Sequence, residues 1–449
     1  MLKILGYPDR YSVAPGEEIA FKISLEEGSH FDARIVRVIH GDANPAGPGL
    51  KFRSVPTKID GRHAGKPQRI DAGSYMRVEH APALAKAPFT FFAMIWPTLP
   101  ERPHQTLLAQ WDPKAGSGFR IEVDQGQLSV TLGDGRDGTA TVASGKAMLV
   151  RQWYAVAISI DPAARSIVLD QAPVGHYAQI DDRAHVEAGV KVAPAAVPAP
   201  LFLAGCPETG GTIGAHFDGK IDGPILCEGV RPAELHKTLL EADPVTEAPK
   251  IIARWDFSKE ISGVTALDVG PAKLHGTLHQ LPTRGMKGWN WTGEEHNWAR
   301  QPDHYGAVHF HHDDVYDAGW ETSVSLAIPD DLPSGPYALH VSCGESDASA
   351  TRESYIAFFV RPPRLAKTRG KRPDIALLVP TASYLAYANH TEHITARGAE
   401  LQMGRLLQFG HIDLYLYEHP ELGGSLYDRH ADGSGVAYTS RLRPNLNCA

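Results

Sequence analysis

Short runs of apolar or alternating residues, separated by turns, recur along most of the chain and limit what it can fold into. Residues 90–96 and 153–160 are almost wholly apolar, whereas Ile19, Phe21 and Ile23 lie on one face of a period-two run. Such runs predict strands packed in layers. The 43 Gly and 34 Pro residues supply the turns that strands of this length need. We therefore expect a mainly β fold up to about residue 365.

The two ends of this β region have similar patterns. In residues 1–65, a Pro-Gly turn leads into the period-two run. In residues 300–365, residues 322–328 alternate and residues 337–341 pair back after a turn. Both patterns are typical of an immunoglobulin-like sandwich. We expect residues 1–65 and 300–365 to form one such domain.

Strand candidates follow one another at short spacing between these ends. The run closes with Phe217-Asp-Gly-Lys-Ile-Asp222, near the last expected strand. This order of strands and the closing motif resemble the laminin-G/concanavalin-like jelly roll. The resemblance implies a jelly roll. From the sequence pattern we expect residues 66–299, the jelly roll with a trailing segment, to be inserted into the immunoglobulin-like domain.

The pattern changes again after residues 361–373, a basic, Pro-rich stretch that we interpret as a solvated linker. Residues 374–380 predict an apolar strand of the parallel type, residues 393–409 a helix and residues 412–417 a second strand. Strand, helix and strand in this order begin a doubly wound α/β domain. Because such a sheet needs more covered strands, residues 366–449 are expected to be an incomplete, truncated α/β domain.

Composition excludes several classes of protein. The formal net charge is −8, so nucleic acid is not an expected partner. The longest apolar stretch, residues 87–97, is far shorter than the ~20 residues of a membrane span. The cysteines form no Cys-x-x-Cys pair, so we expect reduced thiols rather than a zinc site. They are Cys206, Cys227, Cys343 and Cys448. A cytoplasmic protein with no membrane partner is expected.

Two segments of the C-terminal region follow the predicted strands. They are residues 380–389 and 424–428, and each offers a tyrosine. Ligands of open α/β sheets bind beyond the carboxyl ends of the strands. Taken alone, however, a loop tyrosine is most often a packing or hydrogen-bonding residue.

The sequences around these tyrosines are more specific. Tyr384-Leu-Ala-Tyr387-Ala-Asn389 is followed by Ser425-Leu-Tyr427 and then by Arg441-Leu-Arg-Pro444. This succession resembles the large, catalytic subunit of the N,N-dimethylformamidase family. The resemblance covers essentially the whole chain, because it extends to earlier motifs. These are Trp255-Asp-Phe, Asp268-Val-Gly-Pro, Leu281-Pro-Thr-Arg-Gly and His312-Asp-Asp-Val-Tyr-Asp-Ala-Gly-Trp320.

The resemblance implies a mononuclear ferric iron held by two tyrosines and one glutamate. By motif position the tyrosines are Tyr387 and Tyr427, with Tyr384 the nearest rival for the first. Phenolate and carboxylate oxygens are hard donors that suit a highly charged ion, which would lower the phenol pKa from its usual value of about 10. The implied activity is an iron-dependent amidohydrolase that cleaves N,N-dimethylformamide or a similar small amide to formate and an amine. A small partner subunit and a homo-oligomer are also implied.

The glutamate is where the chain departs from the family pattern. In the family it lies in a His-Pro-Glu-Tyr-type segment beyond the Ser-Leu-Tyr motif, and nothing after Tyr427 matches it. His419-Pro-Glu421 is similar but precedes Tyr427. We therefore expect the third ligand to come from elsewhere than this chain. The isolated chain is expected to be inactive or to depend on a partner.

Three further groups of residues are candidates for a chemical role. His309 and His311 share a face if they lie on a strand, as metal ligands or, in the favoured interpretation, as surface hydrogen-bonding residues at a domain junction. His390, Glu392 and His393 follow the first tyrosine loop, either supporting metal ligands or in a solvated loop. Ser434 lies in Gly433-Ser-Gly435, which lacks the spacing of a nucleophile elbow, so a turn residue is expected.

A function without catalysis remains an alternative. Jelly rolls of this type are often binding modules, and a fold does not determine a function. In this alternative the chain is a β-sandwich binding protein for a glycan or protein ligand.

Overall fold

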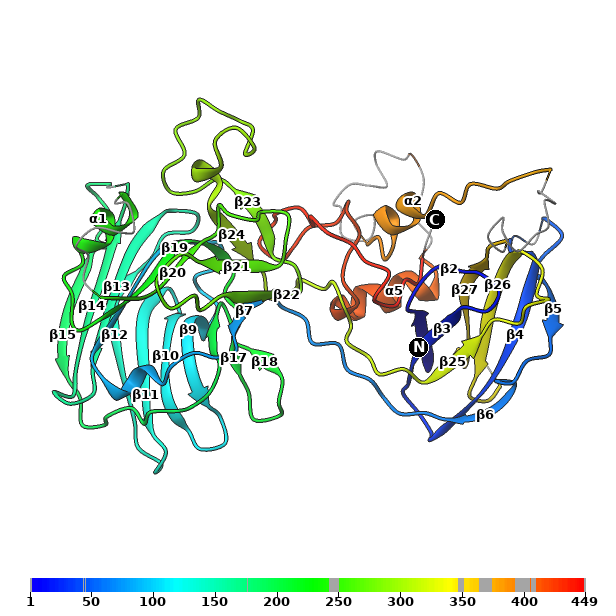
Figure 1. The fold of residues 1–449 in the computed structure, drawn as a ribbon, viewed down its shortest axis with the longest axis horizontal. Helices are drawn as coiled ribbons and strands as arrows, with labels where there is room; N and C mark the ends of the chain where they lie inside the picture. The colour runs from blue at the N-terminus through cyan, green and yellow to red at the C-terminus, as the bar shows by residue number, and fades with distance from the viewer. Residues whose placement is uncertain are drawn as a thin grey trace. The chain divides into compact units, whose positions relative to one another are not determined.

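A computed structural model provides the structure of the chain and divides it into two compact units (Figure 1). Unit 1 comprises Met1–Asp71, Val315–Arg429 and Ser434–Ala449, and unit 2 comprises Ala72–Asp314 and His430–Gly433. The residues that the structure describes are 2–42, 44, 46–175, 177–241, 250–345, 351–362, 374–391, 404 and 409–447.

Two sheets make up the β part of unit 1 (Figure 1, blue and yellow). One has the order β1-β3-β25, and the other has the order β2-β27-β26-β4-β5 with β6 beside β4. The strands are β1 (Ile4–Pro8), β2 (Ser12–Val13), β3 (Glu18–Leu25), β4 (His30–His40), β5 (Lys51–Val55), β6 (Gly61–Ala64), β25 (Val324–Ala327), β26 (Gly335–Ser342) and β27 (Glu353–Val360). Segments from both ends of the β region thus share these sheets.

The period-two run predicted the inner face of β3 correctly. Ile19, Phe21 and Ile23 are almost completely buried. The ring of Phe21 packs edge-on against that of Phe358 of β27, with the centroids 5.5 Å apart. Burial of each such side chain contributes roughly 1.5–3 kcal/mol to folding, so the layer between the two sheets holds this part of unit 1 together.

Unit 2 is built on one large sheet, with sixteen strands among the residues that the structure describes. Its order is β12-β11-β10-β9-β16-β7-β22-β21-β20-β19-β8-β13-β14-β15, and β24 pairs with both β19 and β23. The strands are β7 (Tyr75–Val78), β8 (Phe89–Pro97), β9 (Gln105–Asp112), β10 (Ser117–Asp124), β11 (Gln127–Asp134), β12 (Thr139–Ala147), β13 (Tyr154–Asp161), β14 (Ser166–Pro173), β15 (Ala184–Gly189), β16 (Leu201–Leu203), β19 (Gly219–Glu228), β20 (Ile251–Asp256), β21 (Thr265–Asp268), β22 (Gly276–His279), β23 (Thr283–Met286) and β24 (Ala307–Phe310).

The end strands β12 and β15 contact each other, so the sheet is nearly closed around one apolar core. Residues 90–96 and 153–160 are apolar along their whole length because β8 and β13 have neighbouring strands on both sides and are buried on both faces. Small elements complete the unit. They are η1 (Leu84–Lys86), β17 (Cys206–Pro207), β18 (Ile213–Gly214), α1 (Leu235–Glu241) and η2 (Pro302–Tyr305).

Strand β19 carries most of the motif that begins at Phe217. Along its length it pairs with β8, while its first residues pair with β24 and its last residues with β20. The register sets Lys220 of β19 opposite His309 of β24. This edge of the sheet therefore positions the histidines discussed below.

The first strand predicted for the C-terminal region is wrong. Residues 374–380 form no strand, and Ile375, Leu377 and Leu378 are almost fully exposed. A strand needs a neighbour to pair with, and none of the described strands pairs with this segment. The first regular element here is α2 (Thr381–Tyr387) instead.

The second predicted strand is also wrong. Residues 412–417 belong to helix α5 (His411–Glu418). An apolar run this short fits either a strand or a helix. The side chain of Asp413 accepts a hydrogen bond from the Gly410 backbone N–H at 2.9 Å, which caps the first turn. The helix predicted for residues 393–409 lies, except for Gly404 and Phe409, outside the described residues.

Two other expectations from the sequence concern the cysteines and membrane-spanning segments. Cys206 and Cys227 are free and buried, and Cys343 is free and partly buried, as predicted for reduced thiols. Cys448 lies outside the described residues. Among the helices that the structure describes, none has the length and apolar character needed to span a bilayer.

Candidate functional site

The structure brings Tyr387 and Tyr427 together in unit 1. Tyr387 is the last residue of α2, and Tyr427 lies in the turn after η4 (Pro420–Leu422). The two rings stack with centroids 4.5 Å apart and planes 22° apart, and both are exposed. Hydrogen bonding with Tyr387, together with its charge, raises the pKa of Tyr427. The stacking therefore places the two phenol groups side by side.

Asn389 ties the segment after α2 to two later parts of the chain. Its buried side-chain amide donates to the carbonyl oxygens of Leu422, at 3.2 Å, and Pro444, at 2.9 Å. Its Oδ1 atom accepts a hydrogen bond from the backbone N–H of Leu446 at 2.9 Å. The φ angle of +61° at Asn389 is one that Asn tolerates better than most residues. This residue thus fixes the position of the chain directly after Tyr387.

The Tyr427 turn is held by charged side chains. Arg443, 1 % exposed, donates to the carbonyl oxygens of Leu422 at 3.0 Å and Gly424 at 2.6 Å. The carboxylate of Asp428 accepts a hydrogen bond from the backbone N–H of Ser425 at 2.7 Å. Charge-assisted hydrogen bonds of this kind are stronger than neutral ones. They fix the backbone from which Tyr427 projects.

The other residues predicted near the tyrosines differ in their surroundings. Tyr384 lies on α2 and is partly buried. Glu421 pairs with His419, whose Nδ1 atom is 2.7 Å from Glu421 Oε1. The Nδ1 atom of His390 lies 3.1 Å from Ser425 Oγ, so this residue supports the turn. Glu392 and His393 lie outside the described residues, and Ser434 lies in irregular backbone without a strand-to-helix setting.

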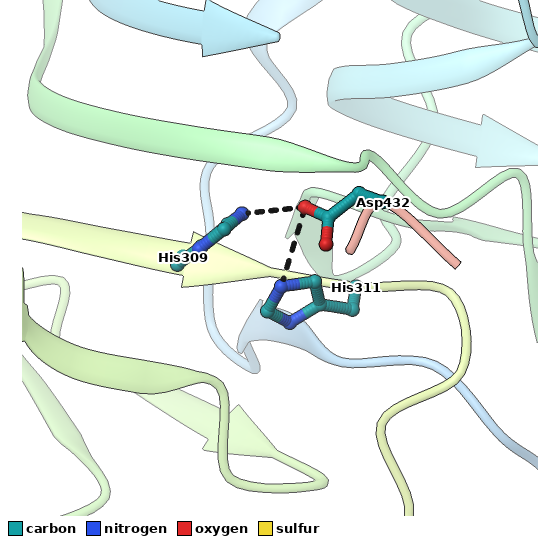
Figure 2. A group of neighbouring side chains, drawn as sticks. All are labelled: His309, His311 and Asp432. Atoms are coloured by element: carbon teal, nitrogen blue, oxygen red, sulfur yellow. Dashed lines mark ion pairs between the residues drawn. The ribbon is translucent and has the colours of Figure 1, made fainter. Parts of the chain in front are cut away.

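A second candidate site lies in unit 2. His309 of β24 and His311 just after it point toward Asp432, as Figure 2 shows. Asp432 Oδ2 lies 3.2 Å from His309 Nε2 and 3.7 Å from His311 Nε2. All three side chains are almost completely buried. The predicted shared face of the histidines is confirmed, whereas the interpretation as surface residues is wrong.

A second set of side chains adjoins this group and shares His311. The Nδ1 atom of His311 is 3.3 Å from Asp314 Oδ2, and His430 Nε2 is 3.6 Å from Asp314 Oδ1. The rings of His311 and His430 stack with centroids 3.8 Å apart. Sequence reasoning missed His430 and Asp432, which lie more than 100 residues after His309 and His311 and on no strand.

Opposite charges stabilise part of this cluster. His430 Nδ1 lies 2.8 Å from Asp313 Oδ1. Burial alone would raise the pKa of Asp313, but its hydrogen bond with His430 and the charge of His430 hold that pKa at about 2. Burial would likewise lower the pKa of His430, but Asp313 and Asp314 raise it. Burial lowers the pKa of His309 to about 4, against the opposing effect of Asp432.

The donor atoms of the cluster suit a metal ion. Two groups of residues each place their donor atoms within 4.8 Å of one another: His309, His311 and Asp432, and His311, Asp314 and His430. Imidazole nitrogen and carboxylate oxygen are common ligands of divalent first-row ions. The chain therefore carries a buried His/Asp group that is a candidate for metal binding.

Known proteins resemble this chain along nearly its whole length. The family model for the C-terminal part of N,N-dimethylformamidase beta subunit-like proteins matches residues 283–448. The N,N-dimethylformamidase beta subunit of Paracoccus aminophilus is 36 % identical over 469 aligned positions, which cover 99 % of this chain and 60 % of the relative. This chain is therefore similar to the N,N-dimethylformamidase beta subunit over nearly its whole length.

A second relative shows the same similarity. The N,N-dimethylformamidase beta subunit of an Alcaligenes species is 33 % identical over 468 positions, which again cover 99 % of this chain and 60 % of the relative. The chain thus spans about 60 % of the length of these curated relatives. The resemblance of the sequence to the N,N-dimethylformamidase family is confirmed.

Solved structures resemble only parts of the chain. A putative carbohydrate binding protein from Bacteroides ovatus is 12 % identical, with 62 % of this chain and 96 % of that chain covered and a TM-score of 0.34. A sialidase carbohydrate-binding module from Ruminococcus gnavus is 16 % identical, with 38 % and 96 % covered and a TM-score of 0.29. TM-scores this low carry no argument about the function of this chain.

Proposed function

We propose that this chain provides two iron ligands of a hydrolase that cleaves the C–N bond of N,N-dimethylformamide, or of a similar small amide, to formate and an amine. The observation that supports this best is the contact between Tyr387 and Tyr427, which come from separate segments and stack with ring centroids 4.5 Å apart. The similarity to N,N-dimethylformamidase beta subunits supports this reaction class.

The tyrosine pair fits a ferric ion in its chemistry. Phenolate oxygen is a hard, anionic donor, which a small and highly charged cation prefers. Without a cation, Tyr387 opposes ionisation of Tyr427 and raises its pKa. A bound cation reverses this effect, because it stabilises both phenolates. Two stacked phenols are therefore a suitable pair of neighbouring ligands.

We propose that the third ligand is a glutamate outside the described residues. Glu421 is poorly placed for the role because its carboxylate is engaged by His419. The described residues that act on the pKa of Tyr427 include Tyr387 but no carboxylate. The alternative within the described chain, a site with two tyrosines and Glu421, is thus disfavoured.

In the proposed mechanism the ion would activate the amide and the water, and the protein positions the ligands of the ion. Bound ferric iron would polarise the amide carbonyl and make water a better nucleophile. The protein's own part is to hold Tyr387 and Tyr427 in a fixed relation. Asn389 fixes the chain after Tyr387, and Arg443 fixes the turn that carries Tyr427. Such supporting contacts matter because a loosely held ligand set binds and reacts poorly.

The proposal also includes the domain architecture, the partners and the cellular location of the chain. Residues 1–65 with 300–365 would be an immunoglobulin-like domain, residues 66–299 a concanavalin/laminin-G-like jelly roll with a trailing segment, and residues 366–449 part of the catalytic domain. The name of the relatives, beta subunit, supports a partner subunit for this chain. We further propose a homo-oligomer and a cytoplasmic location.

Metal analysis and visible absorption of the purified chain test the proposal. After loading with ferric iron and desalting, the chain should retain iron and show a tyrosinate-to-iron charge-transfer band. A colourless, iron-free chain would contradict the proposal and favour a β-sandwich binding protein, for which a glycan array is the next experiment. Turnover of dimethylformamide is expected only when the missing carboxylate is also supplied.

A further inference from the structure

We propose that His309, His311 and Asp432 bind a divalent first-row transition-metal ion, best fitted by zinc, at a structural site in unit 2. This site is separate from the proposed iron ligands, which lie in unit 1. Its role is to fasten the short segment His430–Gly433 to the edge of the sheet at β24.

The distances from the Asp432 carboxylate oxygen to the two histidine nitrogens match those between ligands of a tetrahedral ion. Zinc binds nitrogen and oxygen at about 2.0–2.2 Å, so two ligands of a tetrahedral site lie about 3.4 Å apart. Asp432 Oδ2 is 3.2 Å from His309 Nε2 and 3.7 Å from His311 Nε2 (Figure 2). The side chains therefore need little movement to enclose an ion.

A neighbouring carboxylate orients His311 as a ligand. His311 Nδ1 lies 3.3 Å from Asp314 Oδ2, and because the carboxylate only accepts, Nδ1 is the donor. Asp314 Oδ2 in turn accepts the hydroxyl hydrogen of Ser74 at 2.6 Å. The Nε2 atom of His311 is then the one left to bind a metal. Metal-binding histidines usually have exactly such a carboxylate on the other ring nitrogen.

His309 provides an independent indication that a ligand belongs here. Its side chain is 4 % exposed, yet its Nε2 atom makes no hydrogen bond of acceptable geometry. Buried polar atoms are normally satisfied, and an exception calls for an explanation such as a bound ion. The unsatisfied nitrogen is directed at Asp432 (Figure 2), where the ion would lie.

The surroundings favour a structural ion over a catalytic one. The three ligand side chains are between 0 and 4 % exposed. On the neighbouring strand, Lys220 lies opposite His309, and its ammonium group covers the ring of Trp96 at 4.2 Å. These side chains leave the ligands no exposed face for a substrate. A buried water is the expected fourth ligand.

The second group, His311, Asp314 and His430, is the weaker candidate. His311 Nδ1 already donates to Asp314, and His430 Nδ1 is engaged by Asp313 at 2.8 Å. These contacts instead help to hold the segment, together with the hydrogen bond from Arg151 to the Asp432 carbonyl oxygen at 2.6 Å. An ion at Asp432 completes a set of contacts that already converge on these four residues.

The experiment uses the full chain carrying Tyr387→Phe and Tyr427→Phe, so that iron at the tyrosines cannot contribute. We expect this variant, purified without chelators, to retain about one equivalent of zinc by elemental mass spectrometry. His309→Gln and Asp432→Asn should each weaken zinc binding more than 100-fold, and Asp314→Asn about 10- to 100-fold. His312→Gln is the matched control, because His312 is adjacent but bonds to Asp218.

A second measurement keeps the proposal testable if a variant fails to fold. Zinc added to the metal-free tyrosine double variant should raise its unfolding temperature, whereas magnesium should not. Cobalt in place of zinc should give the visible spectrum of a tetrahedral site. Absence of retained zinc together with no thermal shift would overturn the proposal. So would loss of zinc on removal of the tyrosines alone, or unchanged affinity in folded His309→Gln and Asp432→Asn.

Discussion

The phenol rings of Tyr387 and Tyr427 stack with their centroids 4.5 Å apart, although helix α5 lies between the two residues in the sequence. Replacing either phenol with a phenyl ring keeps the stacking and removes only the oxygen. We expect Tyr387→Phe to abolish the charge-transfer band and to lower bound iron more than tenfold. Elemental analysis and visible absorption after ferric loading measure both effects.

Tyr384→Phe is the matched control for this prediction. Tyr384 and Tyr387 lie one turn apart on α2, so the same helix carries both substitutions. The control should keep the iron and the colour. If Tyr384→Phe lost them while Tyr387→Phe did not, the first ligand would have to be Tyr384.

The next prediction concerns Gly423, where the backbone conformation and a neighbouring side chain leave no room for a Cβ atom. Its φ angle is +75°, and an added Cβ atom would lie 1.7 Å from Arg443 Nη1. Gly423→Ala should therefore displace the guanidinium that holds the Tyr427 turn. The backbone strain alone costs roughly 1–3 kcal/mol. We expect lower thermal stability and weaker iron binding in this variant.

Gly435→Ala controls for a new methyl group in the same region. An added Cβ at Gly435 would meet no atom within 4 Å, and its φ angle is not positive. This variant should keep the stability and the iron affinity of the parent. Equal effects of the two substitutions would mean that Arg443 does not hold the Tyr427 turn.

The sequence made the β units predictable because burial leaves a strong pattern in strands. The period-two run of Ile19, Phe21 and Ile23 and the apolar segment of β13 both became the expected strands. The C-terminal region was predicted less well. The apolar run within α5 is short enough to fit either type of element, and residues 374–380 have no partner strand among the described residues.

The two candidate sites also differ in how far the sequence predicted them. Tyr387 and Tyr427 were found from family-like motifs, which each lie within a few neighbouring residues. His309 and His311 were found from strand spacing, but their burial was not. Asp432, which faces them, is far away in the sequence, and only the folded chain brings it near. Contacts between distant segments leave no local signal in one sequence.

Replacing Arg284 of β23 should lower the stability of unit 2. Its guanidinium donates to five backbone carbonyl oxygens at distances of 2.8–3.1 Å. These belong to Phe257, Lys259, Glu260, Gly263 and Thr265. Lysine has only three donors on one atom, so Arg284→Lys leaves buried carbonyls unsatisfied. We expect a loss of about 2–4 kcal/mol.

Denaturant unfolding of unit 2 measures this loss, with hydrogen exchange used to assign the transition. Arg300→Lys is the control, because the Arg300 side chain is mostly exposed and only pairs with Glu295. It should change stability by less than about 1 kcal/mol. A similar small change in Arg284→Lys would show that water replaces the lost hydrogen bonds in the native state.

His236 of α1 should make unit 2 sensitive to acid. Its buried ring stacks on Phe92 at 5.3 Å, and its Nε2 atom lies 3.3 Å from the carbonyl oxygen of Gly223. Burial lowers the pKa of His236 to about 4. The unfolded chain, with a histidine pKa of about 6.5, takes up a proton between these values while the native state does not. Stability should therefore fall as the pH drops from 6.5 toward 4.

The expected loss between pH 7.5 and pH 5.0 is about 2 kcal/mol from this residue alone. Urea unfolding of the chain at the two pH values measures it. His236→Gln keeps a donor for Gly223 but does not titrate, so its loss over the same interval should be smaller by about that amount. His296→Gln, at an exposed position, should leave the pH dependence unchanged. If both variants followed the parent, His236 would be protonated in the native state, and the neutral, stacked arrangement against Phe92 would be incorrect.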